Sequence, residues 1–151
     1  MKPKIPIEIL FVEDNPGDIR LMLEILKDCE VANHVTVLMD SEEVLPYLRK
    51  EGKYATATRP ALILLDLNLP KKNGKEVLAK IKAHPVIKRI PVVVFSSSDA
   101  EQDIINAYEL NANCYIAKPP DLNYFIRVMK AIEDFWLTIV KLPMDPGRGS
   151  L

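Results

Sequence analysis

Short, largely apolar runs alternate with longer amphipathic segments along most of this chain. A run that is apolar throughout, rather than at every second position, is typical of a strand buried on both faces of a sheet. Strands of this kind, when separated by helices, form a parallel sheet with helices packed against both of its faces. The five runs that we expect to form strands are 7–13, 34–40, 61–66, 91–96 and 113–118.

The segments that follow these runs carry apolar residues at spacings of three and four, which predicts helices. Asn15 is placed to cap the first of them. Ser98 and Glu101 have the spacing of a capping box before the fourth. Pro46 lies inside the second helix and is expected to kink it or delay its start. The expected helices cover 16–29, a segment after Asp40, 74–84, 100–111 and 121–140.

Together these elements predict an α/β fold. The expected architecture is a doubly wound, five-stranded parallel sheet, a flavodoxin-like (βα)5 three-layer sandwich with strand order 2-1-3-4-5. We assign 5–140 to one domain with an extended last helix. The segment 141–151 is rich in Pro and Gly and is expected to be a flexible tail. An alternative for its last residues is that they remain from the expression vector and are not native.

Composition excludes several classes of function. The chain has 151 residues and a net charge of -1, which gives no broad positive field for nucleic acid or a membrane surface. No apolar run approaches the roughly 20 residues of a membrane span. Cys29 and Cys114 lack metal-site spacing and are expected to be reduced thiols of a cytoplasmic protein. His34 and His84 lie far apart, so a histidine metal site is not expected.

The carboxyl ends of the expected strands carry polar and charged residues. Because ligands bind at this edge of a doubly wound sheet, these side chains are expected to converge. Several carboxylates held together resist joint ionisation unless a cation is present, and a hard divalent ion such as Mg²⁺ relieves the repulsion. A lysine supplies a second positive charge suited to a phosphoryl group. The residues at the strand ends are Glu13, Asp14, Asp66, Ser96 and Lys118.

Each of these residues also has an ordinary structural interpretation. An acidic pair after a strand often begins a turn and a helix, and Asp66 alone would be a solvated loop residue. Ser96 and Lys118 could each simply end a strand. The functional interpretation depends on the joint occurrence of all the required groups at separate strand ends.

The motifs around these residues resemble those of response-regulator receiver domains of two-component signalling. The chain has FVEDNPGD after the first strand, LLDLNLPKKNG around the third, VVVFSSS at the fourth and YIAKPP at the fifth. The resemblance covers roughly 5–138. The EDNPGD sequence, the polar insertion near 51–60 and the long last helix resemble the small stand-alone regulators paired with phytochrome-type histidine kinases.

The resemblance implies a role for each site residue. Asp66 would accept a phosphoryl group from a phosphohistidine of a sensor histidine kinase. Mg²⁺, or alternatively Mn²⁺, would be held by carboxylates and by the backbone carbonyl of Asn68. Asn68 and Ser98 would tune the hydrolysis of the acyl phosphate. The implied metal ligands are Glu13, Asp14, Asp66 and Asn68, and the implied phosphoryl-binding residues are Ser96 and Lys118.

Tyr115 resembles the aromatic switch residue of the family, although a partly buried tyrosine at a sheet edge is the structural alternative. As a switch, its ring would turn inward after phosphorylation and remodel the face made by the fourth helix, fifth strand and fifth helix. The resemblance also implies a cis peptide between Lys118 and Pro119.

No output domain is expected, so the signal would leave through protein contacts. The end of the last helix carries an apolar stripe of Phe135, Trp136, Ile139 and Val140. We expect this stripe to support homodimerisation through the face of the fourth helix, fifth strand and fifth helix. The alternative is that the stripe folds back on its own domain.

Other classes of protein remain open from the sequence. A flavodoxin-like FMN protein needs a hydroxyl- and glycine-rich phosphate loop, where this chain has Glu13 and Asp14. An aspartyl phosphohydrolase usually has an acid two residues after the nucleophile, where this chain has Asn68. A phosphorelay intermediate that passes its phosphoryl group on, and a degenerate receiver that only binds partners, are the remaining alternatives.

Overall fold

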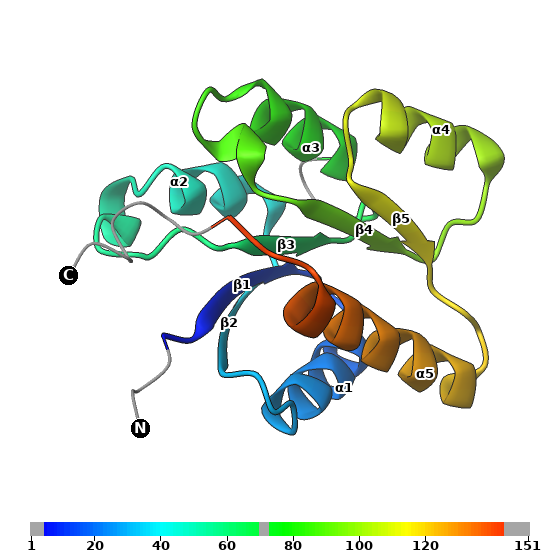
Figure 1. Cartoon of the computed structure of the whole chain (residues 1–151). Helices are drawn as coiled ribbons and strands as arrows, with labels where there is room; N and C mark the ends of the chain where they lie inside the picture. The colour runs from blue at the N-terminus through cyan, green and yellow to red at the C-terminus, as the bar shows by residue number, and fades with distance from the viewer. Residues whose placement is uncertain (1–4, 70–72, 144–151) are drawn as a thin grey trace.

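The computed structural model of the chain describes residues 5–69 and 73–143. Within them lies a five-stranded parallel sheet in the order β2-β1-β3-β4-β5, which confirms the predicted topology (Figure 1). The strands are β1 Ile7–Val12, β2 Asn33–Leu38, β3 Leu62–Leu65, β4 Val92–Ser96 and β5 Cys114–Ala117. Part of the LPKKNG motif, 70–72, and most of the expected tail, 144–151, lie outside the described residues.

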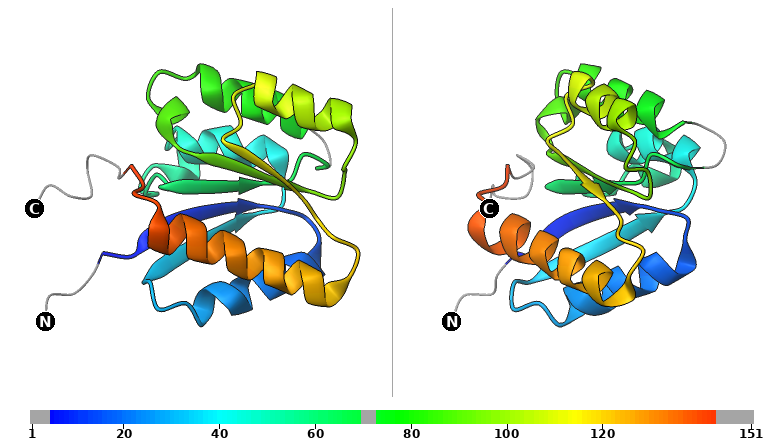
Figure 2. Two further views of the ribbon diagram at one scale, coloured as in Figure 1. Left: turned by 45° about the vertical axis from the view of Figure 1, so that its right-hand side comes forward. Right: turned by 90° about the vertical axis from the view of Figure 1, so that its right-hand side faces the viewer.

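Helices cover both faces of the sheet and make three layers. Helices α1 and α5 pack on one face, and α2, α3 and α4 lie on the other, as the turned views in Figure 2 also show. The sandwich architecture is therefore confirmed. The helices are α1 Pro16–Lys27, α2 Val44–Leu48, α3 Gly74–Ala83, α4 Glu101–Glu109 and α5 Leu122–Glu133.

Strand β1 shows why the apolar runs have no polar side. Leu10 and Val12 belong to the core beneath α2 and α3, whereas Ile9 and Phe11 belong to the core beneath α1 and α5. All four side chains are almost fully buried. Each buried side chain of this size contributes about 1.5–3 kcal/mol relative to exposure. The central strands are therefore held in place from both faces, which fixes the position of their ends.

Side-chain caps begin three of the helices near the carboxyl edge of the sheet, where Asn15 caps α1, Asn73 caps α3 and Asp121 caps α5. The Asn15 side chain accepts a hydrogen bond from the backbone N–H of Asp18 at 3.0 Å, as predicted. Asp121 accepts one from the N–H of Tyr124 at 2.9 Å and caps α5. These caps satisfy backbone donors that have no partner within the helix.

The predicted capping box before α4 is wrong. Ala100 occupies the N-cap position and provides no side-chain hydrogen bond. The Ser98 hydroxyl instead donates to Asp103 at 2.6 Å and accepts from the N–H of Ala100 at 3.3 Å. Ser98 therefore lies in the loop ahead of the helix, tied to its first turn through Asp103.

The second helix begins late, as Pro46 suggested. A 3₁₀ turn, Ser41–Glu43, follows Asp40, and α2 begins at Val44. The Asp40 side chain accepts from the N–H of Glu42 at 2.9 Å. The chain then makes a further 3₁₀ turn, Gly52–Tyr54, within the polar insertion.

The last helix is shorter in α-helical form than predicted. Helix α5 ends at Glu133, and a π-helical segment continues it over Asp134–Ile139. The N–H of Val140 donates to the carbonyl of Phe135 at 2.9 Å, a bond across five residues. Ile132 and Leu137 are both buried and lie five residues apart, so the wider turn keeps both in the core.

Gly74 permits the close approach of α3 to the loop after β3. A Cβ at this position would lie 2.5 Å from the Cα of Leu67 and 2.7 Å from its carbonyl oxygen. The Gly74 N–H donates to that same carbonyl at 3.2 Å. Gly74, the glycine of the LPKKNG motif, is therefore required because a side chain here would collide with the backbone of Leu67. Leu67 directly follows Asp66, so this contact lies beside the site.

The expected cis peptide before Pro119 is wrong. Every peptide bond in the described part of the chain is trans, including the one between Lys118 and Pro119. The trans form is the ordinary preference of X–Pro bonds, by about 0.5–1 kcal/mol.

Candidate functional site

The carboxyl ends of the central strands bring the predicted site residues together. Val12 and Leu65 are paired between β1 and β3, so Glu13 and Asp66 follow at neighbouring positions. Ser96 ends β4, and its carbonyl accepts the N–H of Lys118 at 2.7 Å just beyond β5. The convergence expected from the sequence is therefore present in the structure.

The Lys118 ammonium lies among three carboxylates. Its Nζ is 2.6 Å from Glu13 Oε1, 2.8 Å from Asp18 Oδ2 and 3.1 Å from Asp66 Oδ2. Burial by itself lowers the pKa of Lys118, but the hydrogen bonds to Asp18 and Glu13 outweigh this effect and raise it above its ordinary value. Lys118 is therefore a permanent positive charge at this edge of the sheet.

Glu13 is fully buried, which is unusual for a carboxylate. Burial raises the pKa of Glu13 to about 7, although the hydrogen bond to Lys118 acts in the opposite direction and nearby Asp66 adds to the rise. The second oxygen, Oε2, accepts the N–H groups of Asp14 and Asn15 at 3.2 Å each. Glu13 is thus held in a fixed orientation at the end of β1.

Glu13, Asp14 and Asp66 form a cluster that fits a divalent cation. One carboxylate oxygen from each lies within 4.8 Å of the others, a spacing found in no other acidic, histidine or cysteine group of the described residues. The donors are all oxygens, which suits Mg²⁺ or Mn²⁺ rather than a soft metal. The structure does not test the predicted carbonyl ligand, Asn68, whose N–H donates to Asp66 Oδ1 at 2.9 Å.

The Ser96 hydroxyl lies at the end of β4, between Asn68 and Ser98. Its oxygen is 3.3 Å from Asn68 Nδ2 and 3.4 Å from the N–H of Ser98, both of which donate to it. Because the oxygen already accepts two hydrogen bonds, the hydroxyl proton is the part of the group left to donate. Ser96 is fully buried, so this geometry is protected from bulk water.

Tyr115 on β5 reaches the same loop. Its hydroxyl donates to the Ser98 carbonyl at 2.8 Å, and its ring is half-buried. Its own N–H donates to the Tyr108 hydroxyl of α4 at 3.2 Å. Tyr115 therefore connects β5, α4 and the loop after β4, while its role as a switch stays a prediction.

Asp18 contacts the site but was not assigned a role from the sequence. The available signal was Asn15: a capped helix that begins at Pro16 places Asp18 in its first turn, at the same edge as Glu13. Asp103 and Lys75 were missed as well, and their ion pair of 3.0 Å between the first turns of α4 and α3 had no sequence signal.

The buried Glu13 leads to a prediction for metal-free protein. Folded protein holds the Glu13 proton up to about pH 7, because burial raises the pKa of Glu13, whereas the unfolded chain releases it near the ordinary glutamate pKa of 4.5. The folded state therefore binds more protons in this window, and the free energy of unfolding should fall as the pH rises through it, by at most about 3 kcal/mol.

Urea unfolding in EDTA at several pH values between 5 and 7.5 measures this slope. The Glu13→Gln variant should be flatter over the same range, because it has no proton to release. Equal slopes for the two proteins would show that Glu13 is ionised in the folded state at pH 5.

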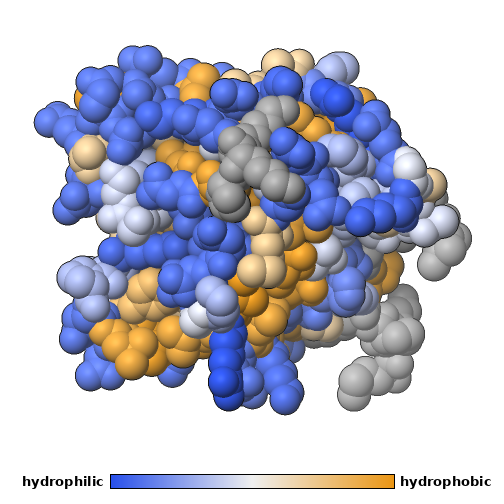
Figure 3. All heavy atoms as spheres, turned by 180° about the vertical axis from the view of Figure 1, so that it is seen from behind, coloured by the Kyte–Doolittle hydropathy of each residue, from blue (hydrophilic) through white to orange (hydrophobic). Residues whose placement is uncertain are grey.

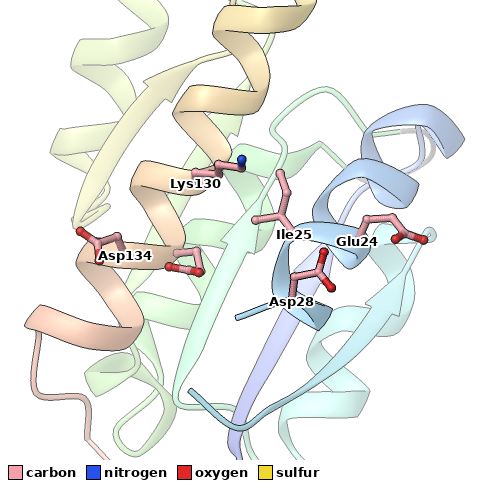
Figure 4. A pocket seen from close by; sticks show the side chains of 6 residues that line it. Glu24, Ile25, Asp28, Lys130 and Asp134 are labelled. Carbon is pink, nitrogen blue, oxygen red and sulfur yellow. The ribbon is translucent and has the colours of Figure 1, made fainter. Parts of the chain in front are cut away.

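Two hollows lie away from the carboxyl edge of the sheet, where Glu13, Asp66 and Lys118 meet. One is an acidic hollow of about 470 Å³ between α1 and the end of α5, lined by Glu24, Ile25, Asp28, Lys130, Glu133 and Asp134 (Figure 4). The other, of about 490 Å³, is apolar and lies between β5 and the end of α5. Figure 3 shows the back of the molecule, where apolar residues gather in the lower half, the side of the sheet that α1 and α5 cover.

The two cysteines are free thiols, as predicted. Burial raises the pKa of Cys29 and of Cys114, so neither is poised as a thiolate.

In the described part of the chain, no helix has the length and apolar character needed to cross a membrane.

The model of the response regulator receiver domain family matches residues 9–130. The chain therefore belongs to this family and is a receiver domain of two-component signalling, whose partner is a histidine kinase. The FMN-binding alternative is set aside by this result, and the chain belongs to a signalling family rather than to an ordinary class of enzyme.

Individual relatives share nearly the whole chain. Response regulator Rcp1 of Synechocystis sp. is 47% identical over 138 residues, which cover 91% of this chain and 94% of Rcp1. The structure of phosphorylated RcpA, a cyanobacterial phytochrome response regulator, has 52% identity and a TM-score of 0.89 over 92% of this chain and 99% of RcpA. The structure of Mn²⁺-bound Rcp1 has a TM-score of 0.90 over 91% of this chain and 99% of that protein.

The bacteriophytochrome response regulator AtBRR is a more distant structural relative. It is 40% identical to this chain, with a TM-score of 0.69 over 91% of this chain and the whole of AtBRR. The predicted resemblance to phytochrome-associated regulators is confirmed at the level of these relatives.

Proposed function

We propose that Asp66 is the phosphoacceptor of a response regulator contained in 5–140. The observation that carries the proposal is the position of Asp66, a 5% exposed carboxylate shared by the Lys118 ion pair and the acidic cluster with Glu13 and Asp14. A carboxylate is a weak nucleophile, so its reaction depends on positioning and on neutralisation of charge.

The reaction transfers a phosphoryl group between two side chains. An Asp66 oxygen forms a bond to phosphorus while the bond from phosphorus to the kinase histidine nitrogen breaks, and that nitrogen keeps the electron pair. Glu13, Asp14, Asp66 and the Asn68 carbonyl would hold Mg²⁺ or Mn²⁺, which when bound neutralises charge on the phosphoryl oxygens.

Residues of this chain supply the remaining stabilisation. Lys118 stays protonated, and its three carboxylate partners hold it at the strand end. One of its three N–H groups would leave its carboxylate partner and bind a phosphoryl oxygen. Ser96 donates its free hydroxyl proton to another oxygen. Asn68 and Ser98 flank that hydroxyl and tune how fast water hydrolyses the acyl phosphate.

The proposed signal passes through Tyr115. A phosphoryl group brings a charge of about -1.5 to -2 beside Ser96, and any shift of the loop after β4 would be felt by Tyr115 through its bond to Ser98. The face of α4, β5 and α5 would then change its population of states. We infer a phytochrome-type kinase as the partner from the relatives RcpA and AtBRR, and a cytoplasmic location, where Cys29 and Cys114 stay reduced.

Incubation of the chain with Mg²⁺ and acetyl phosphate tests the proposal. Intact mass should rise by one phosphoryl group, and EDTA should prevent the rise. An unchanged mass with Mg²⁺ present would contradict the proposal, including the expected self-catalysed phosphorylation.

We also propose a homodimer through the face of α4, β5 and α5, to which the π-helical continuation of α5, Asp134–Ile139, contributes. Phe135 is 48% exposed and Ile139 62% exposed, whereas Trp136 packs partly against the core and stacks edge-on with Phe135. The apolar hollow beside them is lined by Ile116, Val128, Ile132, Phe135 and Trp136, together with Asn113, Cys114 and Ala131. A partner side chain that fills this hollow would remove the exposed apolar surface from water. Val140, half-buried, completes the proposed face.

Sedimentation velocity at micromolar concentration is expected to show a dimer that Phe135→Glu converts to a monomer. The new charge would have to be buried without a partner, which costs several kcal/mol. Met39→Glu is the matched control, because Met39 is 49% exposed near the opposite edge of the sheet. A monomer at all concentrations, with and without acetyl phosphate, would rule out the dimer.

A further inference from the structure

A second polar cluster lies beside the acceptor site, outside the residues that the phosphotransfer itself uses. Asp103 in the first turn of α4 uses both of its carboxylate oxygens: Oδ1 pairs with Lys75 Nζ of α3 at 3.0 Å, and Oδ2 accepts the Ser98 hydroxyl at 2.6 Å. The cluster therefore ties two helices to the loop after β4.

Ser98 is held at every polar group that it has. Its hydroxyl donates to Asp103, its carbonyl accepts the Tyr115 hydroxyl at 2.8 Å, and its N–H donates to Ser96 Oγ at 3.4 Å. A continuous chain of contacts therefore runs from Lys75 through Asp103 and Ser98 to the Ser96 hydroxyl.

A small cavity of about 100 Å³ lies along this chain of contacts. Its lining joins the two groups of residues, since Ser96 and Asn68 of the acceptor site form one part and Lys75, Ser98 and Asp103 another. Among these lining residues, Ser98 is the one that forms hydrogen bonds both to Asp103 and to Ser96. It therefore links the two groups.

We propose that Lys75 and Asp103 are positioning residues that set the rate of phosphorylation by fixing Ser98 and, through it, the Ser96 hydroxyl. The inference rests on the proposed function of Asp66. Neither residue touches the reacting atoms. They act by keeping the Ser96 hydroxyl in position. If this hydroxyl, which stabilises the transition state, is misplaced, the reaction slows even though the fold is intact.

The chemistry of the pair fits a positioning role better than a stabilising one. The side chains of Lys75 and Asp103 are 33% and 34% exposed, so their ion pair is screened and adds little to the stability of the fold. The hydrogen bond from Ser98 and then the pairing with Lys75 lower the pKa of Asp103, which keeps it an acceptor at neutral pH. Without an ionised Asp103, the Ser98 hydroxyl has a weaker partner or none.

The rate constant for phosphorylation by acetyl phosphate with Mg²⁺ tests the proposal. Asp103→Ala should lower it roughly three- to tenfold, the effect of losing one hydrogen bond of ordinary net strength. Asp103→Asn retains an acceptor for Ser98 and should recover most of the rate. Lys75→Met should lower the rate less than Asp103→Ala, because the Ser98 bond survives. Glu101→Ala, in the same turn of α4, is the matched control and should leave the rate unchanged.

A double variant separates positioning from a general structural effect. Ser98→Ala alone should lower the rate about as much as Asp103→Ala, and the two together should cost no more than either. Independent, multiplicative losses in the double variant would overturn the proposal, as would an unchanged rate in Asp103→Ala.

Hydrogen exchange in the unphosphorylated chain tests the same contacts without phosphotransfer. The amides of Ser98 and Ala100, which donate to Ser96 Oγ and Ser98 Oγ, should exchange faster in Asp103→Ala than in wild type, and Glu101→Ala should match wild type. Unchanged exchange would overturn the positioning role. Faster exchange in a protein that forms no phosphoryl adduct would instead support the positioning of the loop and refute the function proposed for Asp66.

Discussion

Asp66→Asn is expected to abolish the phosphoryl adduct that wild-type protein forms with acetyl phosphate and Mg²⁺. The amide has no anionic oxygen to attack phosphorus, and it removes one of the three carboxylates that suit the metal. We expect the rate to fall roughly a hundredfold or more, as for loss of a nucleophile. Intact mass spectrometry over time measures the change directly.

The substitution should leave the fold intact, so the loss can be assigned to chemistry. Asparagine has nearly the same shape as aspartate, and Lys118 keeps its ion pairs with Glu13 and Asp18. Asp99→Asn is the control, because Asp99 is an exposed aspartate of the loop after β4. An adduct that persists in Asp66→Asn would place the phosphoacceptor elsewhere in the chain.

Most of the site was predictable because strand ends are determined by the apolar pattern. A run such as Leu62–Leu65 is buried on both faces, so it can only end where the chain leaves the core, and Asp66 follows at that point. Parallel strands place their carboxyl ends at one edge, which is why residues distant in sequence could be expected to meet.

Contacts made by helix side chains were harder to predict. Asp18 meets Lys118 from the first turn of α1, and Asp103 meets Ser98 from the first turn of α4, so both contacts depend on where a helix begins. The sequence pattern of Ser98 and Glu101 favoured a capping box, but the Ser98 hydroxyl bonds to Asp103, five residues along the chain, instead. A serine ahead of a helix has more than one local partner, and the spacing of residues alone did not show which of them it would take.

The π-helical end of the last helix has a similar cause. Apolar residues at spacings of three and four predicted a continuous α-helix to Val140. In the structure, the burial of both Ile132 and Leu137 requires a spacing of five, and the backbone widens to provide it. The apolar spacing was informative about the helix, but not about its hydrogen-bond pattern.

Lys118→Met is expected to have the largest effect on stability, because it leaves a group of buried carboxylates without their cation. Glu13 and Asp66 are both nearly inaccessible to solvent, and Asp18 loses the same partner. Breaking a buried ion pair by removing one partner typically costs about 3–5 kcal/mol. The free energy of unfolding in EDTA at pH 8 should fall by an amount in this range.

The loss should depend on pH and on metal. Near pH 5.5 Glu13 can take up a proton, since burial has already raised its pKa to about 7 and the loss of Lys118 raises it further. The deficit should therefore be smaller at pH 5.5 than at pH 8. Mg²⁺ at pH 8 should restore part of the stability by neutralising the same carboxylates. Phosphorylation should remain impaired, because Lys118 is one of the groups proposed to bind the phosphoryl group.

Urea unfolding of Lys118→Met at both pH values, with EDTA and with Mg²⁺, measures these differences. Lys130→Met is the control, because it removes an exposed lysine of α5 and should change stability by less than about 0.5 kcal/mol. A loss below about 1 kcal/mol at pH 8 without metal would mean that the carboxylates are already solvated or protonated. In that case Lys118 would serve phosphoryl binding alone, and the charge balance inferred for the resting site would be wrong.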